Sequence, residues 1–269
     1  MNESDPISAA DLLRNLRELV AIDQDFGVQV LPRSPTAQAN QAPPPRPTPA
    51  TPAATAPAAT AAPAASEAPL PALDLPHDGD ATSGLATIAQ AIAGCQRCGL
   101  CQGRRNTVPG EGNASPELAF IGEGPGADED RQGRPFVGAA GQLLDRMIQA
   151  MGLQREEVFI GNVIKCRPPG NRTPEADEAA ACLPYLEAQL DLLRPTVICT
   201  LGNTPLKAMR GPSTPGITRQ RGQPFQWRGF TVLPTFHPSY LLRNEAAKKP
   251  AWEDLKEVLR LLDRPVPGR

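Results

Sequence analysis

The stretch "ELAFIGEGPG", residues 117–126, decides the fold, because an apolar run of strand length stops abruptly at a Gly-Pro turn. Three similar apolar runs follow it: "VFIGNVIK" at 158–165, "TVICTLG" at 196–202 and "FTVLPTF" at 230–236. Helical patterns stand between the runs and after the last one, at about 139–151, 175–193, 203–210 and 250–263. Alternating strands and helices predict an α/β fold with three layers, α/β/α, around a central, mainly parallel four-stranded sheet.

The loops that follow the four runs point to the functional rim of this sheet. In such sheets, functional side chains gather beyond the carboxyl ends of the strands. Here these loops read "GEGPGADED", "NVIKCRPPGNRTP", "GNTPLKAM" and "HPSYLLRN", all rich in Gly, Pro, Asn or charge. We therefore expect Glu123, Asn162 and His237 on one rim. The chain has only two histidines, and a lone histidine is more often structural, so it is this convergence that favours a functional His237.

The N-terminal third has a different composition from the rest. Residues 1–30 contain "SAADLLRNLRELVAI", whose leucines recur at helical spacing and predict an amphipathic helix that docks on the core or binds a partner protein. Residues 31–81 are rich in Pro and Ala, and 13 of the 32 prolines fall between Pro32 and Pro76. Such a segment predicts a disordered linker. The globular domain is therefore expected at 82–269.

Charge separates along the chain in the same way. Residues 1–93 carry 4 Lys and Arg against 10 Asp and Glu, whereas residues 94–269 carry 23 against 19. The mildly basic globular part is compatible with a polyanionic partner. No apolar run is long enough to span a bilayer, and no charged-then-apolar signal opens the chain, so we expect a cytoplasmic protein that does not use a membrane.

Six cysteines indicate a metal centre. "GCQRCGLC" places Cys95 and Cys98 at a spacing that lets two thiolates converge on one centre, and Cys166 and Cys182 supply a second pair. A disulfide framework is not expected without a secretion signal. Four thiolates suit either zinc or a [4Fe–4S] cluster. We leave Cys101 out as one thiolate too many, and Cys199 is expected to be a small core residue in the run "TVICTL".

Several motifs occur together in a familiar order: the paired cysteines, "GEGPG", "GRPFVGAAGQLLD", "NVIKCRPPGNRTP" and "HPSYLLR". With them the chain resembles the type-4 uracil-DNA glycosylases, the iron–sulfur branch of the uracil-DNA glycosylase superfamily, from about Ala91 to Arg243. The resemblance implies a [4Fe–4S] cluster with a structural role. Its ligands would be Cys95, Cys98, Cys166 and Cys182.

The resemblance also implies a DNA repair reaction. The enzyme would flip uracil out of DNA and hydrolyse its N-glycosidic bond, releasing free uracil and leaving an abasic site without cutting the strand. Phe136 would stack on the base, and the Asn162 carboxamide matches O4 and N3–H of uracil, a pattern that cytosine inverts. His237 would donate a hydrogen bond to O2 as charge develops on the leaving base. Such an enzyme is expected to act as a monomer.

The remaining site residues follow from the same resemblance. Glu123 would position water or the sugar, Gly124 would lie against the substrate, and Glu129 would crowd C5 and exclude thymine. Leu241, with Leu242 as its alternative, would fill the gap left by the flipped base. DNA contacts are expected from Lys165, Arg167, Arg172, Ser239 and Arg243.

Two other functions fit parts of the sequence. One is a non-catalytic module that binds damaged DNA or a polymerase complex and carries a structural metal cluster. The intact set of Phe136, Asn162 and His237 argues against it. The other is an iron–sulfur redox protein that binds a small nucleotide, but the chain lacks a GxGxxG loop and a further ligand set.

Overall fold

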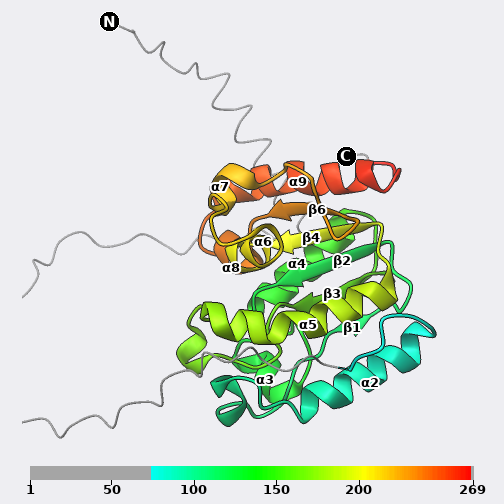
Figure 1. Ribbon diagram of the computed structural model, residues 1–269. Helices are drawn as coiled ribbons and strands as arrows, with labels where there is room; N and C mark the ends of the chain where they lie inside the picture. Colours follow the sequence, from blue (N-terminus) through cyan, green and yellow to red (C-terminus); the bar gives the residue numbers. More distant parts are fainter. Residues whose placement is uncertain (1–73, 268–269) are drawn as a thin grey trace, which may run out of the picture.

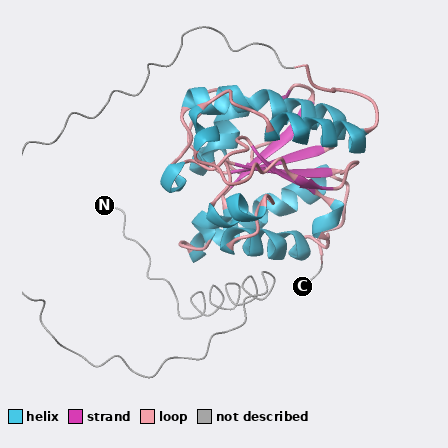
Figure 2. Ribbon diagram, turned by 90° about the horizontal axis from the view of Figure 1, so that it is seen from below, coloured by secondary structure: helices cyan, strands magenta, loops and turns pink. Residues whose placement is uncertain are grey.

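A computed structural model describes residues 74–267 of the chain (Figure 1). The predicted N-terminal helix, residues 1–30, and most of the predicted linker, residues 31–81, lie outside the described residues. In the described part, helices cover both faces of one sheet, as Figure 2 shows, and the predicted α/β class with a mainly parallel sheet is confirmed. None of the helices in this part is both long and apolar enough to cross a membrane.

The sheet has six strands in the order β1-β3-β2-β4-β6-β5. The four predicted strands form its parallel centre: β2 (Leu118–Gly122), β3 (Phe159–Asn162), β4 (Val197–Leu201) and β6 (Phe230–Thr235). The predicted number of four strands is wrong, because β1 (Glu111–Gly112) pairs with β3 and β5 (Phe225–Trp227) pairs with β6, both antiparallel at the edges. These edge strands are two and three residues long and only partly buried, so no apolar run marks them in the sequence.

Side chains of the central strand β2 alternate between two cores. Leu118 and Phe120 pack on one side with α4 (Ala139–Ala150) and α9 (Lys248–Leu261), and Ala119 and Ile121 pack on the other side with α2 (Ala81–Ala93) and α5 (Ala176–Leu193). All five residues of β2 are buried, which explains its continuous apolar pattern. Each large apolar side chain that is fully buried contributes about 1.5–3 kcal/mol to stability.

The predicted helices agree with α4, α5, α6 (Asn203–Arg210) and α9 to within two residues at each end. Apart from α2, the remaining helices are short: α3 (Ala127–Gln132), α7 (Ile217–Gln220), α8 (Pro238–Leu241), η1 (Gly99–Gln102), η2 (Arg155–Glu157), η3 (Pro169–Asn171) and η4 (Glu245–Ala247). Helix α2 was not predicted. It begins after Asp80, whose side chain accepts the Ser83 N–H at 2.9 Å and caps the first turn.

The strand order places four loops at one edge of the sheet. Strand β2 is flanked by β3 on one side and β4 on the other, and all three run parallel, as does β6. The order therefore reverses beside β2, and the loops leaving β2, β3, β4 and β6 lie at the carboxyl ends of the strands (Figure 1).

Candidate active site

A cavity of about 270 Å³ opens at this edge of the sheet. This volume leaves room for a pyrimidine base. Phe136, Asn162 and His237, which are far apart in the sequence, all line it. The other lining residues are Glu123, Gly124, Pro125, Gly126, Glu129, Ala140, Pro168, Asn171, Arg172 and Ser239. Of the residues predicted to hold the substrate or act on it, every one lies on this cavity.

Phe136 is held in an unusual backbone conformation. Its φ of 51° lies in the left-handed region, which an aromatic residue seldom adopts and which costs about 1–3 kcal/mol. A β-carbon at Gly141 would collide with the Phe136 carbonyl, so a glycine is needed under this turn. The Phe136 ring centroid lies 5.7 Å from that of His237, with an interplanar angle of 32°. The strained turn thus fixes one aromatic wall of the cavity.

Asn162 ends strand β3 and carries an unsatisfied acceptor. Only 1% of the residue is exposed, and its Oδ1 atom is buried without a hydrogen-bond partner. Gly122 lies opposite it in the β2–β3 register, and a β-carbon there would come within 2.5 Å of both Asn162 Oδ1 and Phe136 Cζ. A buried acceptor left unpaired costs about 1–3 kcal/mol. This arrangement suits a ligand that brings an N–H donor between the ring and the amide.

His237 follows β6 and is the N-cap of α8. Its Nδ1 accepts the backbone N–H of Ser239 at 3.1 Å and lies 2.8 Å from Ser239 Oγ. Because a backbone N–H only donates, Nδ1 carries no proton, and the neutral ring bears its hydrogen on Nε2. Burial, and then the charge of Arg243, lower the pKa of His237 to about 4, while Glu129 opposes this change. The imidazole is therefore a neutral donor at pH 7.

Glu123 is oriented by a residue that the sequence did not single out. Thr204 Oγ1, in the first turn of α6, donates to Glu123 Oε2 at 2.5 Å. The sequence places "GNTP" in one of the rim loops, but nothing in the pattern distinguishes the threonine hydroxyl from its neighbours. The contact fixes one carboxylate oxygen of Glu123 and leaves the other available.

Glu129 ties two loops together beside the cavity. Its carboxylate accepts the backbone N–H groups of Gly126 at 3.1 Å, Val137 at 2.9 Å and Gly138 at 3.0 Å. These bonds join the start of α3 to the loop that carries Phe136. The predicted exclusion of thymine by Glu129 stays a prediction, and the contacts give this residue a positioning role in addition.

Two of the expected DNA contacts do not fit the structure. Leu241 is fully buried in the core, whereas Leu242 beside it is 44% exposed, so the alternative wedge is the one at the surface. Helix α8 turns Leu241 inward against α4. Lys165 is 1% exposed, and its ammonium is enclosed by protein acceptors, so it cannot reach a phosphate.

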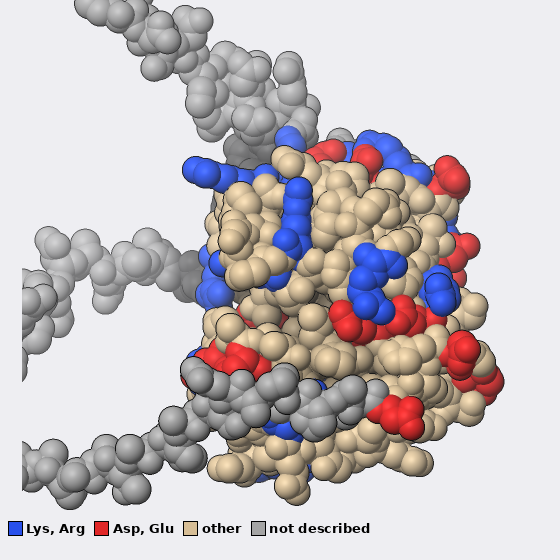
Figure 3. All heavy atoms as spheres, viewed as in Figure 1, with Lys and Arg blue, Asp and Glu red and all other residues tan. Residues whose placement is uncertain are grey.

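The other expected DNA contacts remain at or near the surface. Arg172 forms two bonds to Glu178, at 2.8 and 2.7 Å, and Arg167 Nε donates to Asn171 Oδ1 at 2.7 Å. Arg243 is exposed, and Ser239 lines the cavity. On the face drawn in Figure 3, basic and acidic side chains are both present and much of the surface is uncharged. This face alone therefore offers no continuous basic field for DNA.

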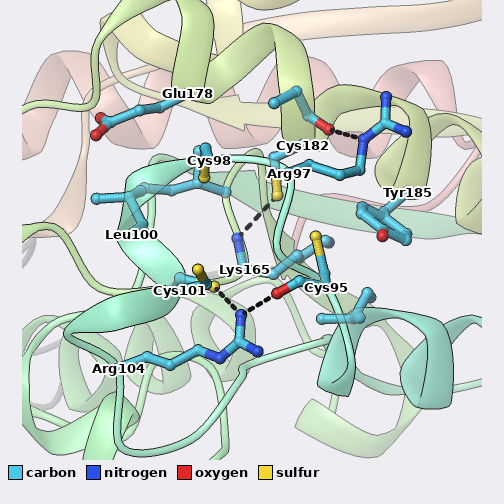
Figure 4. Close-up of a pocket in the computed structure, with 14 residues that line it drawn as sticks. Cys95, Arg97, Cys98, Leu100, Cys101, Arg104, Lys165, Glu178, Cys182 and Tyr185 are labelled. Carbon is cyan, nitrogen blue, oxygen red and sulfur yellow. Dashed lines mark hydrogen bonds between the residues drawn. The ribbon is translucent and has the colours of Figure 1, made fainter. Parts of the chain in front are cut away.

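Five cysteines line a second cavity on the other side of the β3 loop. Cys95, Cys98 and Cys101 come from the segment after α2, and Cys166 and Cys182 from the β3 loop and α5 (Figure 4). In residues 74–267, no three His, Cys, Asp or Glu side chains are grouped closely enough for a single metal ion. A four-iron cube spreads its thiolates around a cluster rather than one ion, so an all-sulfur donor set lining one cavity still fits it.

Hydrogen-bond donors already point at two of these sulfurs. Arg104 Nη1 donates to Cys166 Sγ at 3.2 Å, and the backbone N–H of Lys165 donates to Cys182 Sγ at 3.3 Å. Donors to sulfur stabilise thiolates in metal clusters. Burial raises the pKa of Cys182 to about 12 and also raises that of Cys98 and Cys166, so binding of a metal would release protons. Cys199 is fully buried in β4, as expected for a core residue.

The comparison with protein families identifies the class of this fold and site. Residues 109–256 match the family model described as the Uracil DNA glycosylase superfamily, and the match includes all lining residues of the first cavity. The chain belongs to the uracil-DNA glycosylase superfamily.

Its relatives specify the branch. The type-4 uracil-DNA glycosylase of Sulfurisphaera tokodaii is 45% identical over 189 residues, which cover 67% of this chain and 86% of that protein. The type-4 enzyme of Thermotoga maritima is 48% identical over 160 residues, 59% of this chain and 83% of that protein. The type-4 enzyme of Saccharolobus solfataricus is 45% identical over 186 residues, 66% and 86% of the two chains. The predicted resemblance to the type-4 branch is confirmed.

Proposed function

We propose that the protein is a DNA repair enzyme that takes uracil out of the DNA stack and hydrolyses its N-glycosidic bond. The observation that carries this proposal is the buried, unpaired Oδ1 of Asn162 at the wall of a base-sized cavity. An extruded uracil supplies the missing donor with its N3–H, whereas cytosine presents an acceptor at N3. Leaving the acceptor unmatched is costly, so the site selects uracil strongly.

The aromatic wall contributes affinity without selectivity. Stacking of a base on an aromatic ring such as that of Phe136 contributes about 1–3 kcal/mol and tolerates any base. Because the ring and the Asn162 carboxamide are both held by the protein before a base enters, little ordering remains to be done on binding. The family and the relatives named above support this assignment.

The chemistry is assigned to two side chains. As the bond between uracil N1 and the sugar carbon breaks, its electron pair stays on the base and the sugar gains oxocarbenium character. The Nε2–H of neutral His237 would donate to uracil O2, and such a donor is worth about 3–4 kcal/mol. Water then adds to the sugar carbon and passes its proton to Glu123, whose carboxylate Thr204 holds in place. The products are free uracil and an abasic site.

A [4Fe–4S] cluster completes this proposal, with Cys95, Cys98, Cys166 and Cys182 as its ligands. It would supply a crosslink between the segment after α2, the β3 loop and α5, and no step of the reaction depends on it. The five cysteines among the residues that line the second cavity, and the donors aimed at Cys166 and Cys182, support it.

Other parts of the proposal rest on the sequence. DNA contacts by Arg167, Arg172, Ser239 and Arg243, a monomeric state and a cytoplasmic location stay predictions. The division of the chain also stays a prediction: a helix at 1–30, a linker at 31–81 and a glycosylase domain at 82–269.

A labelled oligonucleotide with a single uracil tests the enzymatic proposal. The full chain should yield an abasic site, detected as an alkali-cleaved strand, and His237→Ala should lower kcat by about 10²–10³-fold. The matched control is His77→Ala, because His77 is the other histidine, with a side chain that is 53% exposed and bonded to Asp191. A wild-type chain that is inactive on both single- and double-stranded uracil DNA would refute the proposal and favour a non-catalytic DNA-binding module.

A further inference from the structure

Lys165 is a buried cation that the proposed reaction does not use. Its Nζ donates to the carbonyl of Asn162 at 2.9 Å, to the carbonyl of Pro109 at 3.1 Å and to Gln189 Oε1 at 2.7 Å. Three donors thus meet three neutral acceptors, and the structure gives this ammonium no carboxylate partner among residues 74–267. An apolar side chain would avoid the cost of burying this charge, so the lysine needs a local reason.

The reason lies just before strand β1 begins. Glu111 lies opposite Ile160 and Gly112 opposite Phe159, in antiparallel register. The next pairing beyond β1 is marked by Asn113 N, which donates to Val158 O at 3.0 Å. In antiparallel ladders, alternate opposite pairs exchange backbone hydrogen bonds. Continued in the other direction, this alternation would make Pro109 and Asn162 such a pair. The next backbone bond on that side, from Val108 N to Lys165 O at 2.8 Å, already lies out of this register, so the regular ladder ends there.

Proline breaks the ladder at that pair, because Pro109 has no N–H to donate to the Asn162 carbonyl. The ammonium of Lys165 takes the place of the missing donor. It also binds the Pro109 carbonyl, which receives a second bond from Gln189 Nε2 at 2.9 Å. A side chain therefore closes the last rung of the β1–β3 ladder, at the residue whose carboxamide faces the cavity.

We propose that Lys165 is a positioning residue that determines uracil selectivity by fixing Asn162. This inference rests on the proposed function. Without the ammonium, two buried carbonyls lose a donor and the end of β3 can shift, which moves Asn162 Oδ1 relative to Phe136. Displacement of a substrate-positioning group by about 1 Å costs on the order of 10²-fold in rate.

A double-mutant cycle on the full chain tests the proposal. Lys165→Met keeps an unbranched side chain, one atom shorter, and removes its donors, and we expect it to lower kcat/KM on the single-uracil oligonucleotide by on the order of 10²-fold. In an Asn162→Ala background, the same change should alter kcat/KM by less than about twofold, since the group that Lys165 positions is already gone. Affinity for an oligonucleotide with an abasic site, which has no base to read, should not change.

Pro109→Ala provides a rescue. The alanine restores a backbone N–H opposite Asn162, so Lys165→Met with Pro109→Ala should recover part of the lost kcat/KM. Visible absorbance from thiolate-to-iron charge transfer reports whether the neighbouring cysteines keep their cluster in each variant. This control is needed because Cys166 follows Lys165 directly.

Each outcome decides the question. A loss seen when Asn162 is present but not in the Asn162→Ala background, with rescue by Pro109→Ala, supports the inference. An equal loss in both backgrounds would overturn it, as would equal weakening for uracil and abasic DNA. Failure of both Lys165 variants to fold would also overturn it, because it would assign the lysine to the stability of the fold. An inactive wild-type chain would refute the proposed function instead, so the two failures are distinguishable.

Discussion

The base cavity and the cysteine cavity flank the same loop, residues 162–166, but they are built in different ways. Around the base cavity, protein atoms fix the side chains: Thr204 holds Glu123, Ser239 holds His237, and a strained turn holds Phe136. Around the cysteine cavity the thiols have few partners. Two of them receive one N–H donor each, and burial keeps several of them protonated.

The two cavities therefore differ in how much of their structure is fixed before a ligand binds. The base cavity is ready before its ligand arrives, as expected where electrostatic stabilisation must act without rearrangement. Under the proposed function, the cysteine cavity would be completed by its cluster, and the free energy of binding that cluster would become part of the free energy of folding. Changes in the cysteines should therefore cost stability first, whereas changes in the base cavity should cost activity first.

The largest expected effect follows from removing a cysteine ligand. Cys182→Ser should abolish the visible absorbance of the iron–sulfur cluster. It should also lower the free energy of unfolding by several kcal/mol, since the lost cluster no longer ties α5 to the β3 loop. Visible absorption and thermal unfolding of anaerobically purified protein measure both. Cys101→Ser is the matched control and should keep the colour. A bleached Cys101→Ser protein would instead place Cys101 in the ligand set.

A single methyl group added at Gly122 tests whether the walls of the base cavity are fixed. In Gly122→Ala, the new β-carbon would lie 2.5 Å from Asn162 Oδ1 and from Phe136 Cζ, so the two walls must move apart. We expect kcat/KM to fall by on the order of 10²-fold, with a stability cost of only about 1–3 kcal/mol. Gly161→Ala is the control, because its β-carbon would also make a tight contact, 3.0 Å from the Phe159 ring, but not with either wall of the base cavity. Full activity of Gly122→Ala would show that the walls are pliable.

The sequence predicted the centre of the fold better than its margins. Fully buried strands such as β2 and β4 leave continuous apolar runs, and long amphipathic helices leave a clear period, so both were found. The edge strand β1 is not predicted, because a half-buried Glu111 and an exposed Gly112 leave no pattern. Its existence depends on pairing with β3, which is a tertiary contact.

The site shows the same limit at the level of side chains. Motifs placed Phe136, Asn162 and His237 at one rim, because the ends of parallel strands meet at one edge. They could not show that Lys165 points inward, since a lysine in "VIKCRPP" looks like a surface cation until the proline opposite Asn162 is known. Nor could they show that Thr204 bonds Glu123, because the two residues lie 81 positions apart.

Neighbouring leucines in α8 provide a smaller and more local test. Leu241 is fully buried and Leu242 is 44% exposed. Leu241→Ala should lower the free energy of unfolding by about 2–5 kcal/mol through the cavity it leaves. Leu242→Ala should leave stability unchanged and weaken turnover on double-stranded more than on single-stranded uracil DNA, because only a duplex needs the gap filled. The reverse pattern would restore Leu241 as the wedge.

The smallest expected effect is that of pH on the reaction, and its absence is the informative result. An ordinary histidine takes up a proton near pH 6.5, but burial and the charge of Arg243 lower the pKa of His237 to about 4. The ring therefore stays neutral at about pH 5 to 8, and kcat should show no inflection near 6.5 in that interval. Arg243→Gln removes the positive charge, so the pKa of His237 should rise and the acid limb should move to higher pH. A wild-type kcat that falls as the pH rises through about 6.5, with that fall abolished by His237→Gln, would mean that the imidazolium is the working form. The Ser239 N–H would then have to release Nδ1 before each turnover, and the base cavity would no longer count as preorganised.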